Sequence, residues 1–228
     1  GADRRNTDAG TGQKESAYLS WGNGPMKTKI KICGLRRKED IVYVNAARPD
    51  YCGFILNVPQ SRRNMDPEGL KGLLEELDPG IVPVGVFVNE DTNTILRIVR
   101  ESGLKMIQLH GQEGEEMVRT IRETAGVPVI KAVSVKSRED VERAAGFPAD
   151  YLLFDCGTGG TGRSFDWSCL EEAKQPYFLA GGIGIHNMRE AVERFHPFAD
   201  DLSSSVETDG VKDKKKIADA VHMLRSLT

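Results

Sequence analysis

The chain has 228 residues, of which 39% are hydrophobic and 29% charged, which is enough for one domain with a sizeable core. Its 31 Lys and Arg residues stand against 34 Asp and Glu residues, and a formal net charge of -3 argues against a nucleic-acid partner. The chain has neither an apolar run of the roughly 18 residues that a membrane span needs nor a secretory signal. We therefore expect a cytoplasmic protein without a membrane partner.

The first 25 residues are polar and show no apolar period, so we expect a disordered leader or a cloning remnant, with Met26 as the natural start. Residues 26–228 are expected to form one catalytic domain. The four cysteines form no C-x-x-C pair and are expected to be free thiols, while the four histidines lack the spacing of metal ligands. We expect neither a metal nor an organic cofactor.

After residue 26, short apolar runs alternate with longer amphipathic segments, which predicts strands followed by helices. Two clear helical patterns cover Thr94–Ser102 and Glu116–Glu123, and two helix starts are expected at Asp66-Pro67 and Ser137. The predicted strands are Lys29–Cys33, Tyr51–Leu56, Val82–Val88, Met106–Leu109, Val129–Val133, Tyr151–Phe154, Tyr177–Ala180 and Ala199–Leu202. Eight such units of about 25 residues predict an α/β fold, a single-domain (β/α)8 TIM barrel, rather than an open doubly wound sheet. The charged clusters at residues 36–40 and 212–216 are interpreted as solvated helix faces.

In a parallel barrel the carboxyl ends of all strands meet at one mouth, where chemistry is placed. Cys33 ends the first run and Asp155 follows the sixth, so both are candidates for a catalytic role. The alternatives are a buried, inert thiol for Cys33 and a helix cap or surface ion pair for Asp155.

A glycine-rich segment, G-T-G-G-T-G, follows Asp155 at residues 157–162. A dinucleotide-binding fingerprint would need a carboxylate at the end of the next strand, and that strand ends in Leu-Ala-Gly-Gly. We therefore interpret Gly159, Gly160 and Gly162 as part of a lid that closes over a substrate.

The loops after the seventh and eighth runs carry glycines and hydroxyl groups. In this architecture these loops commonly hold a phosphate, because glycine admits close backbone approach and serine hydroxyls add donors. The sequence thus predicts a phosphorylated small-molecule ligand, held by Gly181, Gly182, Ser203, Ser204 and Ser205.

Two further side chains follow strands. Arg63 offers a forked donor pair suited to a carboxylate group of the ligand, with a solvated loop arginine as the alternative. His110 could donate a hydrogen bond to the ligand or serve only a structural purpose.

Taken together, these motifs resemble the phosphoribosylanthranilate isomerase family of tryptophan biosynthesis across about Lys29 to Leu227. The resemblance is carried by K-I-C-G (31–34), G-F-I with S-R-R (53–63), V-G-V-F (84–87), Q-L-H-G (108–111), L-L-F-D (152–155), G-G-T-G with F-D-W (159–167), L-A-G-G (179–182) and D-L-S-S-x-V-E (201–207). It implies a (β/α)8 barrel, no metal or cofactor, a general base at Cys33, a general acid at Asp155 and a substrate carboxylate near Arg63.

Two positions depart from the family pattern. Ser205 stands where the family usually has glycine, and the segment Asn57–Gln60 before the arginines is unusual.

The expected reaction is the Amadori rearrangement of N-(5-phosphoribosyl)anthranilate, which needs one acid and one base on opposite sides of the sugar. Closure of the lid is expected to raise the pKa of Asp155 by desolvation.

Three other functions are alternatives. A sugar-phosphate epimerase would want metal-ligating histidines or facing carboxylates, and an indole-forming synthase would want a lysine and glutamates at the mouth. The strand ends predict neither set. A binding protein that has lost activity is the third rival, for which Ser205 is the only hint. The chain is expected to be a monomer or a homodimer.

Overall fold

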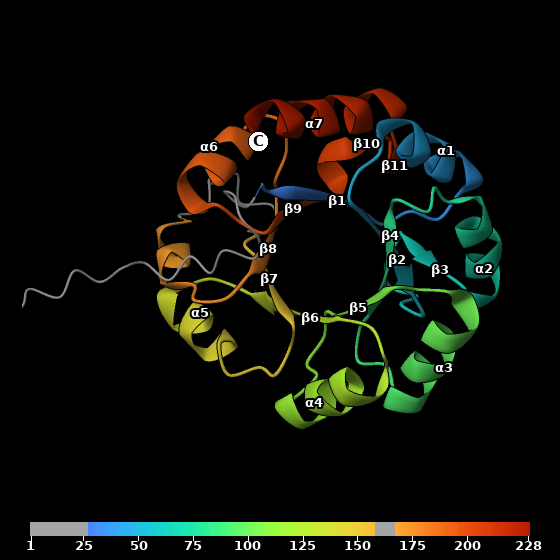
Figure 1. Cartoon of the computed structure of the whole chain (residues 1–228), viewed down its shortest axis with the longest axis horizontal. Coiled ribbons are helices and arrows are strands. Elements are labelled where there is room, and N and C mark those ends of the chain that lie inside the picture. The colour runs from blue at the N-terminus through green and yellow to red at the C-terminus, as the bar shows by residue number, and fades with distance from the viewer. Residues whose placement is uncertain (1–26, 158–166) are drawn as a thin grey trace, which may run out of the picture.

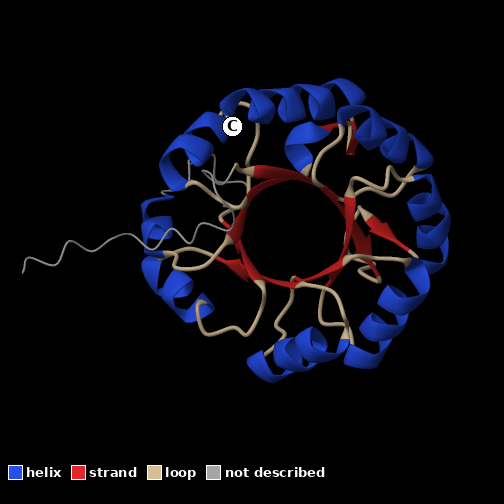
Figure 2. Cartoon of the chain, in the orientation of Figure 1, coloured by secondary structure: helices blue, strands red, loops and turns tan. Residues whose placement is uncertain are grey.

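Eight parallel strands form a closed barrel, as predicted, and helices surround it (Figures 1 and 2). The computed structural model describes residues 27–157 and 167–228. The barrel strands are β1 (Lys29–Cys33), β2 (Tyr51–Leu56), β4 (Val82–Phe87), β5 (Met106–Leu109), β6 (Val129–Ser134), β7 (Tyr151–Asp155), β8 (Tyr177–Ala180) and β9 (Ala199–Leu202). The first strand closes the ring, because Lys31 is in register with Tyr51 of β2 on one side and Asp201 of β9 on the other.

A helical segment follows each barrel strand. These are α1 (Lys38–Ala47), α2 (Pro67–Glu76), α3 (Thr92–Ser102), α4 (Glu115–Thr124), α5 (Arg138–Ala144), the 3-10 helix η1 (Trp167–Glu172), α6 (Met188–Glu190) with its π-helical continuation η2 (Ala191–Phe195), and α7 (Lys214–Leu227). The helix start expected at Ser137 is confirmed, since Ser137 is the N-cap of α5 and its N–H donates a hydrogen bond to the side chain of Asp140. Asp66 occupies the N-cap of α2 as expected but makes no capping hydrogen bond.

Short elements that the sequence did not predict lie between the barrel units. The strand β3 (Asn64–Met65) pairs with β2 just after the two arginines. After β9 come the 3-10 turn η3 (Ser204–Val206) and a small hairpin of β10 (Glu207–Thr208) and β11 (Val211–Lys212). These elements bring Arg63 and Glu207 together.

Two apolar layers hold the fold together. Inside the barrel, inward-facing side chains such as Ile130, Leu153 and Phe178 form one cluster. Between the sheet and the helices, outward-facing side chains such as Ile32, Phe154 and Leu179 form a second, larger cluster. The alternation along each strand therefore decides which residues reach the barrel interior.

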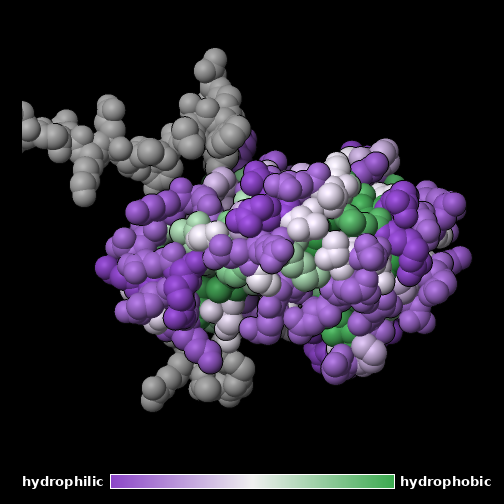
Figure 3. Space-filling model, turned by 90° about the horizontal axis from the view of Figure 1, so that it is seen from below, coloured by the Kyte–Doolittle hydropathy of each residue, from purple (hydrophilic) through white to green (hydrophobic). Residues whose placement is uncertain are grey.

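The surface is mostly polar. Hydrophilic residues cover most of the face shown in Figure 3, with separate apolar patches between them. Within the part of the chain that the structure describes, no helix is long and apolar enough to cross a membrane.

The two charged clusters are solvated at most positions, as interpreted, since Arg36, Lys38, Glu39 and residues 214–216 are exposed, but each cluster also contains one buried residue. Asp40 is 1% exposed and accepts hydrogen bonds from the backbone N–H groups of Arg36 and Arg37, both at 3.0 Å. Lys212 is 4% exposed, and its ammonium group lies 2.7 Å from Oε1 of Glu207. Both residues pair with polar groups because burial would otherwise leave a charge without compensation.

Candidate active site

Polar residues line the upper part of the barrel interior, spaced two apart along the strands. Cys33 follows Lys31 on β1, and His110 follows Gln108 at the end of β5. Asp155 follows the inward-facing Leu153 on β7. Since alternate residues of a strand share a face, the predicted strand ends carry these side chains to one mouth.

Asp155 and His110 lie together on one side of the mouth. Nε2 of His110 is 3.4 Å from Oδ2 of Asp155, while Oδ1 accepts a hydrogen bond from the N–H of Gly157 at 3.0 Å. The side-chain amide of Gln108 donates to Nδ1 of His110 at 2.9 Å, so the proton of the neutral ring lies on Nε2 and faces the carboxylate. Asp155 is thus not a helix cap.

The hydrogen bond from His110 lowers the pKa of Asp155, and that from Gly157 adds to the effect despite partial burial. Two donors thus stabilise the carboxylate form of Asp155 in the described part of the site. The rise in this pKa on closure of the lid stays a prediction. The lid residues Gly159, Gly160 and Gly162 lie outside the described residues.

Gly181 is required for this arrangement. Its φ of +93° is in the left-handed region, and a Cβ there would lie 2.1 Å from the N of Gly157 and 2.7 Å from Oδ1 of Asp155. Gly182 also has a positive φ, +80°, but a Cβ there would meet nothing within 4 Å. Gly181 is therefore required by both its positive φ and the close packing, whereas Gly182 is required only by its positive φ.

Cys33 lies on β1 and is 7% exposed. Burial raises the pKa of its thiol, and the charges of Lys31 and Lys212 oppose that rise without cancelling it. Ser203 donates a hydrogen bond to the carbonyl oxygen of Cys33 at 3.1 Å, which ties the loop after β9 to the end of β1.

Arg63 packs over the turn that follows Cys33. A Cβ at Gly34 would lie 2.4 Å from Cδ of Arg63, so a glycine makes room for the arginine stem. Its guanidinium binds Glu207 through two hydrogen bonds, Nε to Oε1 at 2.7 Å and Nη2 to Oε2 at 2.9 Å. The predicted carboxylate-binding side chain is thus already held by a carboxylate of the protein.

Glu207 also accepts hydrogen bonds from Arg62 at 2.9 Å and from Lys212 at 2.7 Å. Burial would raise the pKa of Glu207, but the hydrogen bonds from Arg63 and Lys212 outweigh it and lower the pKa to about 2. This carboxylate stays ionised and fixes three cationic side chains, of which Arg63 and Lys212 interact electrostatically with Cys33.

The serines of the predicted phosphate loop are arranged differently from one another. Ser205 donates to the carbonyl oxygen of Ile183 at 2.6 Å and so links the loop after β9 to the loop after β8. Its hydroxyl, like that of Ser203, is engaged by the protein, which differs from the expectation that these hydroxyls serve the ligand. Ser204 is exposed in η3.

Sequence reasoning missed the buried charges beneath the mouth. Lys31 donates to both carboxylate oxygens of Asp201, at 3.0 and 3.1 Å, and the lysine is 0% exposed. A lysine therefore does lie under the mouth, although the strand ends did not predict one. Its position two residues before Cys33, inside an otherwise apolar run, was the signal that could have found it.

Asp201 connects the two sides of the mouth. Its carboxyl interacts electrostatically with Lys31, His110 and Asp155, and burial raises its pKa. Among the described residues, no group of three or more His, Cys, Asp or Glu side chains could hold a metal ion.

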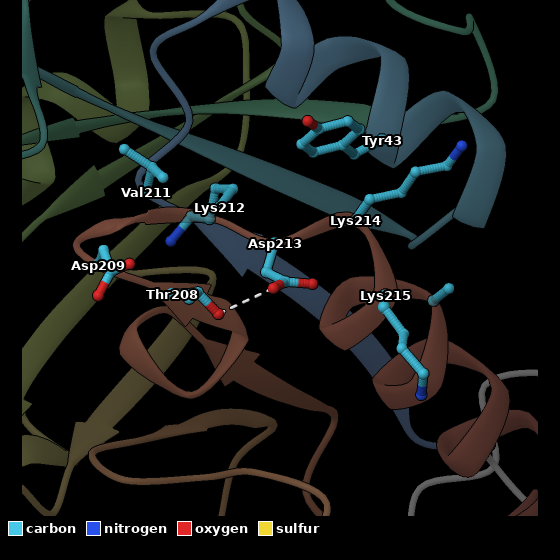
Figure 4. Close-up of a pocket in the computed structure, with 9 residues that line it drawn as sticks. Tyr43, Thr208, Asp209, Val211, Lys212, Asp213, Lys214 and Lys215 are labelled. Atoms are coloured by element: carbon cyan, nitrogen blue, oxygen red, sulfur yellow. Dashed lines mark hydrogen bonds between the residues drawn. The ribbon is translucent and has the colours of Figure 1, made fainter.

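A separate groove of about 650 Å³ lies on the outside of the barrel, between α1 and the segment from β10 to α7 (Figure 4). Tyr43 borders it, and Thr208 donates a hydrogen bond to Asp213 at 2.8 Å along its wall. None of the predicted site residues lines this groove.

A closed (β/α)8 barrel with a thiol, a carboxyl and paired cations at its mouth is an arrangement typical of enzymes that act on small anionic molecules by acid–base chemistry. The family model described as N-(5'-phosphoribosyl)anthranilate (PRA) isomerase matches residues 30–223. The chain belongs to this family.

Known relatives agree with that assignment. An N-(5'-phosphoribosyl)anthranilate isomerase from Endomicrobium trichonymphae is 43% identical over 203 residues, covering 87% of this chain and 99% of the relative. The crystal structure of phosphoribosyl anthranilate isomerase from Thermotoga maritima is similar with a TM-score of 0.80 and 36% identity, over 88% of this chain and 100% of that one.

A second solved isomerase, 34% identical with a TM-score of 0.77 over 88% of this chain and 100% of its own, is in complex with reduced 1-(o-carboxyphenylamino)-1-deoxyribulose 5-phosphate.

Proposed function

We propose that this chain catalyses the Amadori rearrangement of N-(5-phosphoribosyl)anthranilate to 1-(2-carboxyphenylamino)-1-deoxyribulose 5-phosphate, a step of tryptophan biosynthesis, in the cytoplasm. Membership of the isomerase family over residues 30–223 carries this proposal. The ligand in the second solved relative supports the phosphorylated substrate.

Asp155 serves as the general acid. It protonates the ring oxygen of the sugar, the bond from C1 to that oxygen breaks, and the nitrogen lone pair forms a Schiff base with C1. Cys33 as thiolate then removes the proton from C2, the electron pair of that C–H bond forms the C1=C2 bond of an enolamine, and the electron pair of the C1=N bond returns to nitrogen. The proton donated to the ring oxygen and the proton removed from C2 are transferred on different sides of the sugar. An acid and a base from opposite sides of the barrel therefore suit the reaction.

The protonation state of Asp155 depends on the substrate. In the described structure His110 holds this carboxylate in its ionised form. A phosphorylated ligand that fills the mouth would add negative charge and exclude water, both of which raise the pKa of a carboxyl group. His110 then keeps Asp155 oriented toward the sugar.

The two ends of the substrate have separate binding groups. Arg63, held by Glu207, binds the anthranilate carboxylate with the donors of its guanidinium that Glu207 does not occupy. The loops after β8 and β9, with Gly181, Gly182 and Ser204, hold the phosphate, and the link from Ser205 to Ile183 fixes their spacing.

The test is a fluorescence assay that follows loss of the anthranilate substrate on the purified chain, with a chelator present. Cys33→Ala and Asp155→Asn are expected to lower kcat by about a thousandfold or more, since each removes one partner of an acid–base pair. Cys52→Ala is the matched control, because Cys52 is a buried free thiol on β2 that belongs to the outer apolar cluster. Wild-type turnover in either variant, or tight binding of a product analogue without turnover by the wild type, would contradict the proposal.

A further inference from the structure

The barrel interior under the mouth contains a buried ion pair that has no role in the proposed chemistry. Lys31 on β1 and Asp201 on β9 are register partners, with side chains 0% and 7% exposed. Removing two charges from water costs more than packing two apolar side chains at the same place. Stability alone therefore does not explain why these strand positions are charged.

The ion pair lies directly against the thiol of Cys33. Lys31 and Cys33 share the inward face of β1, and the register partner of Cys33 on β2 is Gly53. A Cβ at Gly53 would lie 2.7 Å from Sγ of Cys33 and 3.2 Å from Nζ of Lys31. The sulfur and the ammonium thus share the space that a side chain at residue 53 would fill.

We propose that Lys31 is a positioning residue that favours the thiolate form of Cys33 against the effect of burial, and that Asp201 limits this effect by drawing the ammonium group away from the sulfur. This inference rests on the proposed role of Cys33 as the general base. The lysine keeps its proton: its ammonium donates hydrogen bonds to both carboxylate oxygens of Asp201 and interacts electrostatically with Cys33.

The charges around the thiol act in opposite directions. Burial raises the pKa of Cys33 most, the charge and hydrogen bond of Lys31 lower it, and the charge of Asp201 raises it. Lys212 adds a second lowering contribution from the other side. Asp201 and Cys33 together raise the pKa of Lys31 above its ordinary value even though burial opposes this, so the lysine stays charged.

The proton balance of the reaction fits this arrangement. Cys33 begins as a thiolate and becomes a thiol when it accepts the C2 proton, while Lys31 keeps its charge. When the enolamine converts to the ketone, the thiol returns that proton to C1 and the C2 hydroxyl gives its proton to Asp155. Both groups are then back in their starting states, with the ammonium again facing a thiolate.

The experiment measures the thiolate directly. The rate of alkylation of Cys33 by iodoacetamide is followed from pH 5 to pH 10 by peptide mass spectrometry, in the absence of substrate. The pH at which the alkylation rate is half of its maximum is called the midpoint. For Lys31→Met we expect this midpoint to rise, with alkylation at neutral pH slowed by about tenfold or more. For Asp201→Asn we expect the midpoint to fall.

The opposite signs make the test specific. Both substitutions break the same ion pair, so a purely structural role would change Cys33 in the same way in both variants. The double variant Lys31→Met/Asp201→Leu leaves no buried charge unpaired and keeps the test informative where a single variant does not fold. Its midpoint should lie between those of the two single variants.

The chain offers a matched control. Lys131 and Glu113 form another buried pair, 2.7 Å apart with side chains 3% and 1% exposed, and Lys131 lies among the outward-facing residues of β6. Lys131→Met should leave the Cys33 midpoint unchanged.

Equal or same-direction shifts for Lys31→Met and Asp201→Asn would overturn the proposal. If Cys33→Ala retained turnover, the proposed function would fail while the alkylation midpoints could still be compared. The two failures are therefore distinguishable.

Discussion

Glu207 is the residue on which the cationic side of the mouth depends. It accepts hydrogen bonds from Arg62, Arg63 and Lys212 and is itself buried. Replacing it with glutamine removes the charge that holds Arg63 in place. For Glu207→Gln we expect KM to rise about tenfold with a smaller change in kcat, because substrate anchoring is lost while the acid and base remain.

Steady-state kinetics check this prediction. Glu193→Gln is the control. Glu193 of η2 pairs with Arg189 of α6 on the exposed surface, and exposed ion pairs contribute little to stability. A Glu207→Gln variant with unchanged KM would show that Arg63 does not need its carboxylate partner.

The pair of His110 and Asp155 gives a second prediction at the residue scale. The hydrogen bond from His110 is the largest cause that lowers the pKa of Asp155. In His110→Phe this donor is gone, so the pKa of Asp155 should move upward. Carboxyl carbon NMR titration of the two proteins measures the shift, and an unchanged or lower pKa would contradict the assigned geometry.

The sequence identified single residues well where they stand at a strand end and less well where they stand inside a strand. Cys33 and Asp155 follow apolar runs, so their positions were visible from the pattern alone. Lys31 lies two residues before Cys33 and so shares its face, but nothing local to either strand shows that Lys31 and Asp201 lie against each other. Only the closed ring, which makes β1 and β9 neighbours, shows that the two charges compensate each other.

At the scale of elements, the eight strands could be predicted because parallel barrel strands are buried on both faces and therefore form nearly continuous apolar runs. The predicted bounds differ from those observed by at most one residue at the ends of β4, β6 and β7. The short β3, η3 and the hairpin of β10 and β11 could not be predicted, because segments of two or three residues carry no period. Those elements, however, position Arg63 and Glu207.

The loop after β8 gives the prediction at this scale. Gly181→Ala places a Cβ against the backbone of Gly157, whereas Gly182→Ala meets open space at a similar positive φ. Both variants carry the left-handed strain of roughly 1–2 kcal/mol, and Gly181→Ala adds a steric cost. We expect Gly181→Ala to be the less stable of the two and to lose more kcat. Urea unfolding and kinetics on the matched pair decide it, and equal losses would contradict the close approach.

At the scale of the whole molecule, Asp200 makes stability depend on pH. This residue of β9 is 0% exposed, and neither carboxyl oxygen has a hydrogen-bond partner among the described residues. Burial, with a smaller contribution from the charge of Asp201, raises its pKa to about 8. The folded chain thus binds a proton here that the unfolded chain releases near pH 4.

Stability is therefore expected to fall as the pH rises from about 4 to about 8, because over this window the folded state holds the extra proton. In Asp200→Asn the side chain does not titrate, so this part of the pH dependence should disappear and the variant should gain stability relative to the wild type at alkaline pH. Urea unfolding at pH 5, 7 and 9 measures it, with Asp219→Asn on the exposed face of α7 as the control. Parallel curves for wild type and Asp200→Asn would contradict a buried neutral carboxyl.

The pairing of β1 with β9 also bears on how the protein is made. The first barrel strand to leave a ribosome is the one that carries Cys33, yet one of its two neighbours is the last barrel strand, about 170 residues later. During synthesis, Lys31 has no Asp201 to meet, and its charge favours an open, hydrated β1. Catalytic competence should consequently arise only after nearly the full chain has emerged, with no active nascent fragments along the way.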